Sequence, residues 1–188
     1  MKSHYRAVVI GGGVVGASAL YHLAKMGWND VILVEKIEYT SGSTWHAAGL
    51  LPLFNMSYSV GKIHKYSVDL YQSLEEETGQ HVSFHKTGNL RLARNQERMD
   101  EYKRYCGTAS TIGVPFEMIG PAEIKKLWPF AKVDDLVGAL FHPDDGHVAP
   151  VDVTMALLKG ARANGAETYS EVEAVSETQL RRRTNREA

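Results

Sequence analysis

Cysteine is almost absent from this sequence: one residue, Cys106, occurs among 188. No internal disulfide can therefore form, and the composition fits a reducing compartment. Long apolar runs are absent too, and none approaches the roughly 20 residues that a membrane-spanning helix needs. Basic and acidic side chains nearly balance, at 21 and 22, so net charge gives no argument for an anionic partner. We expect neither nucleic-acid binding nor membrane insertion.

The N-terminus, MKSHYRAVVIGGG, runs directly into a predicted strand and leaves no room for a signal or transit peptide. We therefore expect a cytoplasmic bacterial protein, or a mature domain whose leader is absent. Hydrophobic residues make up 44% of the chain and charged residues 23%. These values are ordinary for a globular domain with a packed core.

The first 35 residues have the pattern of a βαβ unit. A β-branched run at 6–10 predicts a strand, apolar residues at helical spacing predict a helix over 14–26, and 30–35 predicts a second buried strand. Such a unit is right-handed in nearly all proteins. The turn between the first strand and the helix is rich in glycine, and its spacing indicates what the unit binds.

The glycines of that turn are Gly11, Gly13 and Gly16, in the pattern G-x-G-x-x-G. Gly11 permits the tight turn, Gly13 allows the backbone to approach a pyrophosphate, and Gly16 allows the helix to pack closely on the sheet. Glu35 ends the second strand, where a carboxylate accepts hydrogen bonds from an adenosine ribose and repels the extra phosphate of NADP. These residues predict a dinucleotide site and leave FAD and NAD open.

The stretch TSGSTWHAAGL, at 40–50, favours FAD. Ser43 and Thr44 are good N-cap residues, so a second helix N-terminus is expected to face the pyrophosphate. The small residues that follow Trp45-His46 permit close approach of a large planar ring. From these residues alone, His46 is a candidate ligand contact or an ordinary structural histidine.

The rest of the chain alternates strands and helices, with no internal repeat. The tail from residue 176 is polar and arginine-rich, and we expect no regular structure there. In Asp144-Asp145-Gly146 we expect a turn rather than a metal site, because no further ligand cluster accompanies it, and no metal is expected elsewhere. Helices are predicted at 60–78, 95–113, 120–129 and 149–167, and strands at 89–93, 114–119 and 136–143.

Several motifs in order resemble one known family. They are AVVIGGGVVGASALYHLAKMG, VEK, TSGSTWHAAGL, KIHKYSVDLYQSLEEETGQ and DDGHVAPVDVTMALLKGARANGA. Together, over about residues 6–175, they resemble the dimethylglycine and sarcosine dehydrogenases, which belong to the D-amino-acid-oxidase-like FAD enzymes.

The resemblance implies an α/β fold: a Rossmann-like FAD-binding domain of the glutathione-reductase and D-amino-acid-oxidase type, at 1–51 and 143–175. An α+β substrate-side segment at 52–142 interrupts it. Residues 176–188 would be a disordered or truncated tail. Members of the family continue well beyond this length, so we expect a truncated N-terminal part that is inactive alone, with the unassigned catalytic residues in the missing portion.

In the resembling family the histidine of the STWHAAGL motif carries FAD covalently, and His46 occupies that position. FAD contacts are implied in the glycine loop, after the second strand, along the TSGSTWHAAGL stretch and, more loosely, near residue 172. His85 is expected to be an ordinary histidine, although it lies where the substrate-side sheet begins. The implied cofactor-binding residues are Gly11, Gly13, Val14, Val15, Gly16, Glu35, Lys36, Gly42, Ser43, Thr44, Trp45, His46, Ala47, Ala48, Gly49, Leu50 and Val172.

The implied reaction is oxidation of the N-methyl C–N bond of a small N-methylated glycine, with electrons passing to an electron-transfer flavoprotein or to oxygen. Tetrahydrofolate would bind only in the full-length protein. Eukaryotic members of the family are mitochondrial. Two alternatives stay open: another amine or amino-acid oxidase of the same superfamily, and a non-catalytic dinucleotide-binding fragment.

Overall fold

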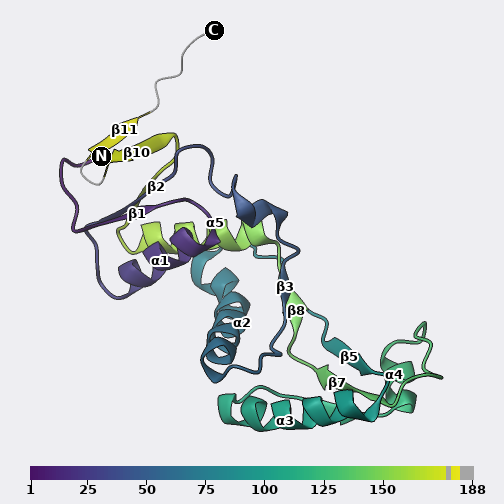
Figure 1. Ribbon diagram of the computed structural model, residues 1–188. Helices are drawn as coiled ribbons and strands as arrows, with labels where there is room; N and C mark the ends of the chain where they lie inside the picture. The colour runs from purple at the N-terminus through teal and green to yellow at the C-terminus, as the bar shows by residue number, and fades with distance from the viewer. Residues whose placement is uncertain (177–178, 183–188) are drawn as a thin grey trace. The chain divides into compact units, whose positions relative to one another are not determined.

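The computed structural model describes residues 1–176 and 179–182, and Figure 1 traces the chain. The chain forms two compact units, each with its own core. The first comprises Met1–Gly49, Ser73–Ser83 and Val148–Ala188, and the second comprises Leu50–Gln72 and Phe84–His147. The functional division predicted at residues 52 and 142 stays a prediction.

A parallel sheet of three strands organises the first unit. Its order is β1 (Ala7–Ile10), β2 (Val31–Val34) and β9 (Glu167–Tyr169). The central strand, VILV, is buried at every position, as expected for a strand covered on both faces. β1 and β2 confirm the predicted strands, whereas β9 has no apolar run and was not predicted.

Two helices pack against each other in this unit and contact the sheet. They are α1 (Val14–Lys25) and α5 (Pro150–Ala163), both of which were predicted. Gly160 makes the close approach possible, because a Cβ there would lie 2.9 Å from Cε2 of the buried Tyr21 ring. The Tyr21 hydroxyl in turn donates to Glu77 at 2.6 Å, which ties α1 to the end of α2 (Tyr58–Thr78).

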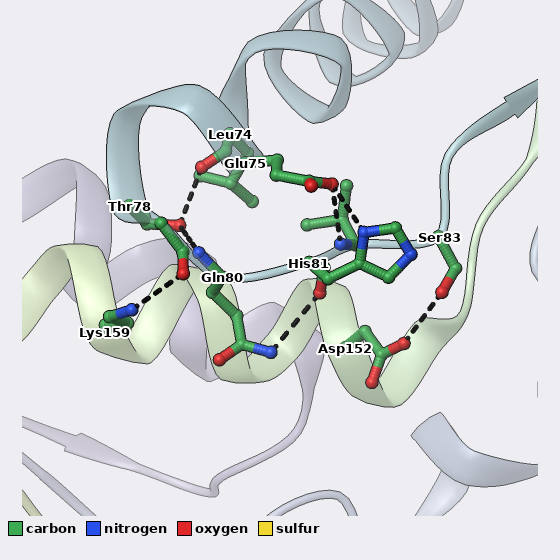
Figure 2. A network of polar contacts seen from close by, with 10 residues as sticks. Leu74, Glu75, Thr78, Gln80, His81, Ser83, Asp152 and Lys159 are labelled. Carbon is green, nitrogen blue, oxygen red and sulfur yellow. Dashed lines mark hydrogen bonds and ion pairs between the residues drawn. The ribbon is translucent and has the colours of Figure 1, made fainter.

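Figure 2 shows how the segment after α2 is held to α5. Lys159 donates to the carbonyl of Gly79 at 3.0 Å, and the Ser83 hydroxyl donates to Asp152 at 3.0 Å. His81 contacts the Glu75 carboxylate at 2.8 Å, and this hydrogen bond raises the pKa of His81 and lowers that of Glu75. These contacts explain why residues 73–83 belong to the first unit although the rest of α2 belongs to the second.

The prediction of an irregular tail is wrong in part. β10 (Val172–Ser176) pairs antiparallel with β11 (Gln179–Arg182), with Val172 opposite Arg182. Strand formation here depends on pairing with a neighbour, which neither the polar composition nor a periodicity announces. Residues 177–178 and 183–188 of the predicted tail lie outside the described residues.

The second unit contains two small antiparallel sheets. The order β5-β7-β6 confirms three predicted strands, and helix α3 begins where Asn95 caps it through a bond from the Arg98 N–H at 2.9 Å. The other sheet, β3-β8-β4, consists of strands of two residues, too short for any sequence pattern. The bounds are β3 Leu50–Leu51, β4 His85–Lys86, β5 Asn89–Ala93, α3 Gln96–Ile112, β6 Glu117–Ile119, α4 Pro121–Leu127, β7 Gly138–His142 and β8 Gly146–His147.

Across the described residues, no helix is long and apolar enough to cross a membrane.

A buried polar cluster lies in the core of the second unit. The Tyr105 hydroxyl donates to the Leu53 carbonyl at 3.2 Å, and His142 Nε2 lies 3.0 Å from the same hydroxyl. Asp145 accepts a bond from the Leu53 N–H at 2.9 Å. Within the described part of the chain, His142 Nδ1, Asp145 Oδ2 and Arg91 Nε are buried without a hydrogen-bond partner.

Burial shifts two pKa values in this cluster in opposite senses. It raises the pKa of Asp145 to about 6 and, with the nearby Arg91 charge, lowers the pKa of His142 to about 4. Between pH 4 and 6 the folded Asp145 keeps a proton that the unfolded chain loses, so its contribution to stability falls as pH rises. The folded His142 lacks a proton that the unfolded chain binds, so its contribution rises with pH. The two effects oppose each other.

Replacing one of the two groups at a time should reveal how the other makes the free energy of unfolding depend on pH. We expect Asp145→Asn to give a chain whose free energy of unfolding rises with pH between about 4 and 6.5, and His142→Gln to give one whose free energy falls over the same range. Each slope relative to the parent is at most about 1.4 kcal/mol per pH unit. Urea denaturation at half-unit pH steps measures it, and slopes of the same sign in both variants would contradict the assignment.

Candidate cofactor-binding site

The glycine loop joins β1 to α1 in the first unit. Gly11 has φ +110°, a conformation that favours glycine. A Cβ at Gly16 would lie 2.0 Å from the Gly11 carbonyl oxygen, so only glycine fits there. Gly13 caps α1 with extended backbone and no side-chain capping bond. The first turn of α1 therefore presents backbone N–H groups at its positive end, the arrangement that binds phosphate in other proteins.

Thr44 closes this loop from the other side. Its buried Oγ1 accepts a hydrogen bond from the Val14 N–H at 3.0 Å, and a Cβ at Gly13 would lie 2.9 Å from the same oxygen. The expectation that Ser43 and Thr44 cap a second helix is wrong: Ser43–His46 is one turn of 3-10 helix capped by Gly42, without a side-chain bond. The Thr44 hydroxyl instead accepts a hydrogen bond from the Val14 N–H, which has no partner within helix α1.

Glu35 lies at the carboxyl end of β2, beside the glycine loop. Its carboxylate accepts from the Gly12 N–H at 2.7 Å and from the Ile37 N–H at 3.0 Å. Its backbone carbonyl accepts from the Val172 N–H at 2.9 Å. The side chain is therefore fixed in place, with spare lone pairs on both oxygens.

A hollow of about 360 Å³ opens at the carboxyl ends of β1 and β2. Ligands of open parallel sheets bind at this edge. The structure brings together here four residues predicted from motifs far apart in the sequence: Gly11, Glu35, Lys36 and Val172. Ile10 ends the first predicted strand and Val34 lies within the second, but neither was predicted to line a site. The prediction missed these lining residues: Ile10, Val34, Glu173 and Ala174.

His46 is exposed at the end of the 3-10 turn. Its Nδ1 lies 3.1 Å from the Gly42 carbonyl oxygen, and its ring lies against Trp45 with 3.9 Å between centroids and the planes tilted by 37°. Because a carbonyl only accepts, this contact assigns the hydrogen to Nδ1 and leaves the Nε2 lone pair free. The ring is thus oriented by the turn that carries it.

The end of the same stretch is fixed by backbone contacts. Gly49 has φ +71°, and a Cβ there would lie 2.0 Å from the Val148 carbonyl oxygen; the Val148 N–H donates to the Gly49 carbonyl at 3.0 Å. Ala47 and Ala48 are exposed, as is Val15 in the first turn of α1. Leu50, 70% exposed, begins the second unit.

The chain matches the sequence profile of the family described as "DAO: FAD dependent oxidoreductase" over residues 6–187. It is 47% identical over 164 residues to "Dimethylglycine dehydrogenase, mitochondrial" of Rattus norvegicus, covering 87% of this chain and 19% of that protein. It is 41% identical to "Sarcosine dehydrogenase, mitochondrial" of Homo sapiens, covering 89% and 18%. The chain thus spans about a fifth of the length of these curated relatives.

Two further similarities widen the range of relatives. "Pyruvate dehydrogenase phosphatase regulatory subunit, mitochondrial" of Mus musculus is 38% identical, over 90% of this chain and 19% of that protein. Among solved structures, the L-proline dehydrogenase from P. horikoshii superposes with a TM-score of 0.84 at 29% identity, over 96% of this chain and 48% of that one. This chain therefore shares its fold with part of that dehydrogenase.

Substituting Gly16 should destabilise the first unit. Because the new Cβ of Gly16→Ala meets a backbone oxygen that cannot rotate away, we expect a loss of about 2 kcal/mol in the free energy of unfolding. Gly42→Ala is the matched control, since its Cβ would meet nothing within 4 Å, and it should change stability by less than about 0.5 kcal/mol. Urea denaturation measures both; equal losses would contradict the close approach at Gly16.

Proposed function

The chain belongs to the DAO family of FAD-dependent oxidoreductases, and we propose that it forms the FAD-holding part of an enzyme that oxidises the N-methyl C–N bond of a small N-methylated glycine. Relatives named dimethylglycine and sarcosine dehydrogenase support this substrate class. The observation that carries the proposal is the geometry of His46, which stands on a turn bonded to the glycine loop with one imidazole nitrogen free.

The residues present fit FAD at its adenosine and pyrophosphate end. The hollow beside Glu35 and Val172 offers a carboxylate for ribose hydroxyls. The N-terminus of α1 offers the N–H groups of its first turn other than that of Val14, which already donates to Thr44. The Thr44 hydroxyl keeps its own hydrogen for a phosphate oxygen. A side chain at Gly13 would narrow this approach.

The proposed tether is a bond between His46 Nε2 and the 8α carbon of the flavin. Gly42 holds the Nδ1 hydrogen, so the free lone pair is on Nε2. His46 would hold the flavin through this nitrogen, and the bound flavin would supply the electrophilic 8α carbon. Covalent attachment through His46 would raise the flavin reduction potential and prevent loss of the cofactor.

The flavin, when bound, supplies the hydride acceptor, and the chain supplies binding and orientation. The small residues Ala47, Ala48 and Gly49 leave room for a planar ring after His46. We propose an electron-transfer flavoprotein or oxygen as the final acceptor, and tetrahydrofolate as a ligand of a longer protein only. No described side chain is assigned a catalytic role.

A different oxidase of the family is the second candidate, because the superposition on an L-proline dehydrogenase is close. A third candidate is a non-catalytic role, since a relative of 38% identity is named as a regulatory subunit. Flavin retention separates the third candidate from the others. Reduction of bound flavin by dimethylglycine, sarcosine or proline, followed anaerobically in a protein of the relatives' length, separates the first two.

We expect acid-denatured chain, prepared with FAD, to keep flavin absorbance and fluorescence on the polypeptide. His46→Ala should lose essentially all of it, because no other described group offers the free Nε2 at this turn. His4→Ala, at an exposed histidine of the same unit, is the control and should keep the parent level. Flavin retained in His46→Ala would contradict the tether. If the parent chain binds FAD but releases it in acid, the proposed cofactor site stands and only the covalent bond is contradicted.

A further inference from the structure

His142 is completely buried in the second unit, and its two ring nitrogens have different surroundings. Nε2 lies 3.0 Å from the Tyr105 hydroxyl, which donates its own hydrogen to the Leu53 carbonyl. Because that hydroxyl can only accept from His142, the hydrogen of the neutral imidazole is on Nε2. Nδ1 therefore carries a lone pair, and it is buried without a hydrogen-bond partner.

Asp145, three residues further along the chain, also has one bonded and one unbonded atom. Its side chain is 1% exposed, and Oδ1 accepts from the Leu53 N–H at 2.9 Å, whereas Oδ2 is buried without a partner. Burial raises the pKa of Asp145 to about 6. At neutral pH the carboxyl is therefore mostly ionised, and Oδ2 is a second acceptor that lacks a donor.

Arg91 supplies the complementary group, an N–H without an acceptor. Its guanidinium lies over the Phe54 ring, with Cζ 4.2 Å from the ring centroid, and its Nε is buried without a partner. In the pairing of β5 with β7, Arg91 and His142 are diagonal neighbours on one face. Such neighbours are about 7–8 Å apart, within reach of a long side chain. Besides burial, the Arg91 charge acts on both acceptors, since it lowers the pKa of His142 and of Asp145.

We propose that Arg91, His142 and Asp145 bind one internal water molecule in the core of the second unit. The water would donate one hydrogen to His142 Nδ1 and the other to Asp145 Oδ2, and would accept from Arg91 Nε. Buried waters in proteins make about three such bonds, to polar groups that otherwise have none. In the part of the chain that the structure describes, these three atoms are the full set of buried side-chain nitrogens and oxygens without a partner.

An ion suits this set of groups less well than water does. The Arg91 guanidinium would repel a cation, and the Asp145 carboxylate would repel an anion. Over the described residues, no group of three or more His, Cys, Asp or Glu side chains could hold a metal. A neutral molecule that both donates and accepts matches two acceptors and one donor.

The site would join segments that are far apart in the sequence. Arg91 belongs to β5 and His142 ends β7, while Asp145 and Tyr105 both hold the Leu53 backbone after β3. One water would thus connect the sheet β5-β7-β6 to the chain that follows β3, entirely within the second unit.

The test measures oxygen-17 relaxation dispersion of the solvent water in a solution of the 188-residue chain at neutral pH. The amplitude of the dispersion reports water molecules held inside the protein and is insensitive to exchange of hydroxyl protons. We expect Asp145→Leu to lose an amplitude equivalent to one water, because it removes an acceptor. Asp145→Asn is the matched control, since its side chain still bonds the Leu53 N–H and offers a polar atom in place of Oδ2, and it should keep the parent amplitude.

Arg91→Met removes the donor and should lose the same amplitude, which keeps the test decisive if Asp145→Leu does not fold. Nitrogen-15 shifts of the His142 ring in the parent should place the hydrogen on Nε2. Equal amplitudes in the parent and in the folded apolar variants would overturn the water site. An equal loss in Asp145→Asn, or a hydrogen on His142 Nδ1, would overturn it as well.

Discussion

One hydrogen bond, from the Val14 N–H to Thr44 Oγ1, joins the two motifs on which the cofactor site depends. It attaches the turn that carries His46 to the helix end that would carry the phosphates. The bond needs an unoccupied N–H at the start of α1 and a bare Cα at Gly13, where a side chain would displace the hydroxyl. The residues proposed for the phosphate and flavin ends of the dinucleotide are thus positioned relative to each other by this one hydrogen bond.

Most of the first unit could be predicted from the sequence, because its elements have strong local signals: β-branched runs, a glycine turn and well-punctuated helices. The sheet β3-β8-β4 could not, since its strands have two residues each and owe their existence to pairing between segments far apart. β11 also depends on pairing, but with β10, which lies directly before it in the chain. Side-chain contacts were harder to predict than elements. Thr44 was expected to cap the helix that follows it, but its hydroxyl accepts from the N–H of Val14, 30 residues earlier.

The buried cluster of Tyr105, His142 and Asp145 has a different character. Its side chains hold the Leu53 backbone on both sides, through the carbonyl and the N–H. Leu53 follows β3 by two residues, so the cluster holds the backbone just after that strand. At the bonds that are made to Leu53, these polar groups constrain the backbone more sharply than apolar packing does.

β1 has a neighbour on one side only among the described strands, and its Val8 and Ile10 side chains are 43% and 67% exposed. Parallel strands are normally covered on both faces. The open edge of β1 therefore presents unpaired backbone groups beside apolar side chains, a template for another strand. Handled alone and at high concentration, the chain would tend to pair through β1 with copies of itself, so dilution and low temperature favour its monomeric form.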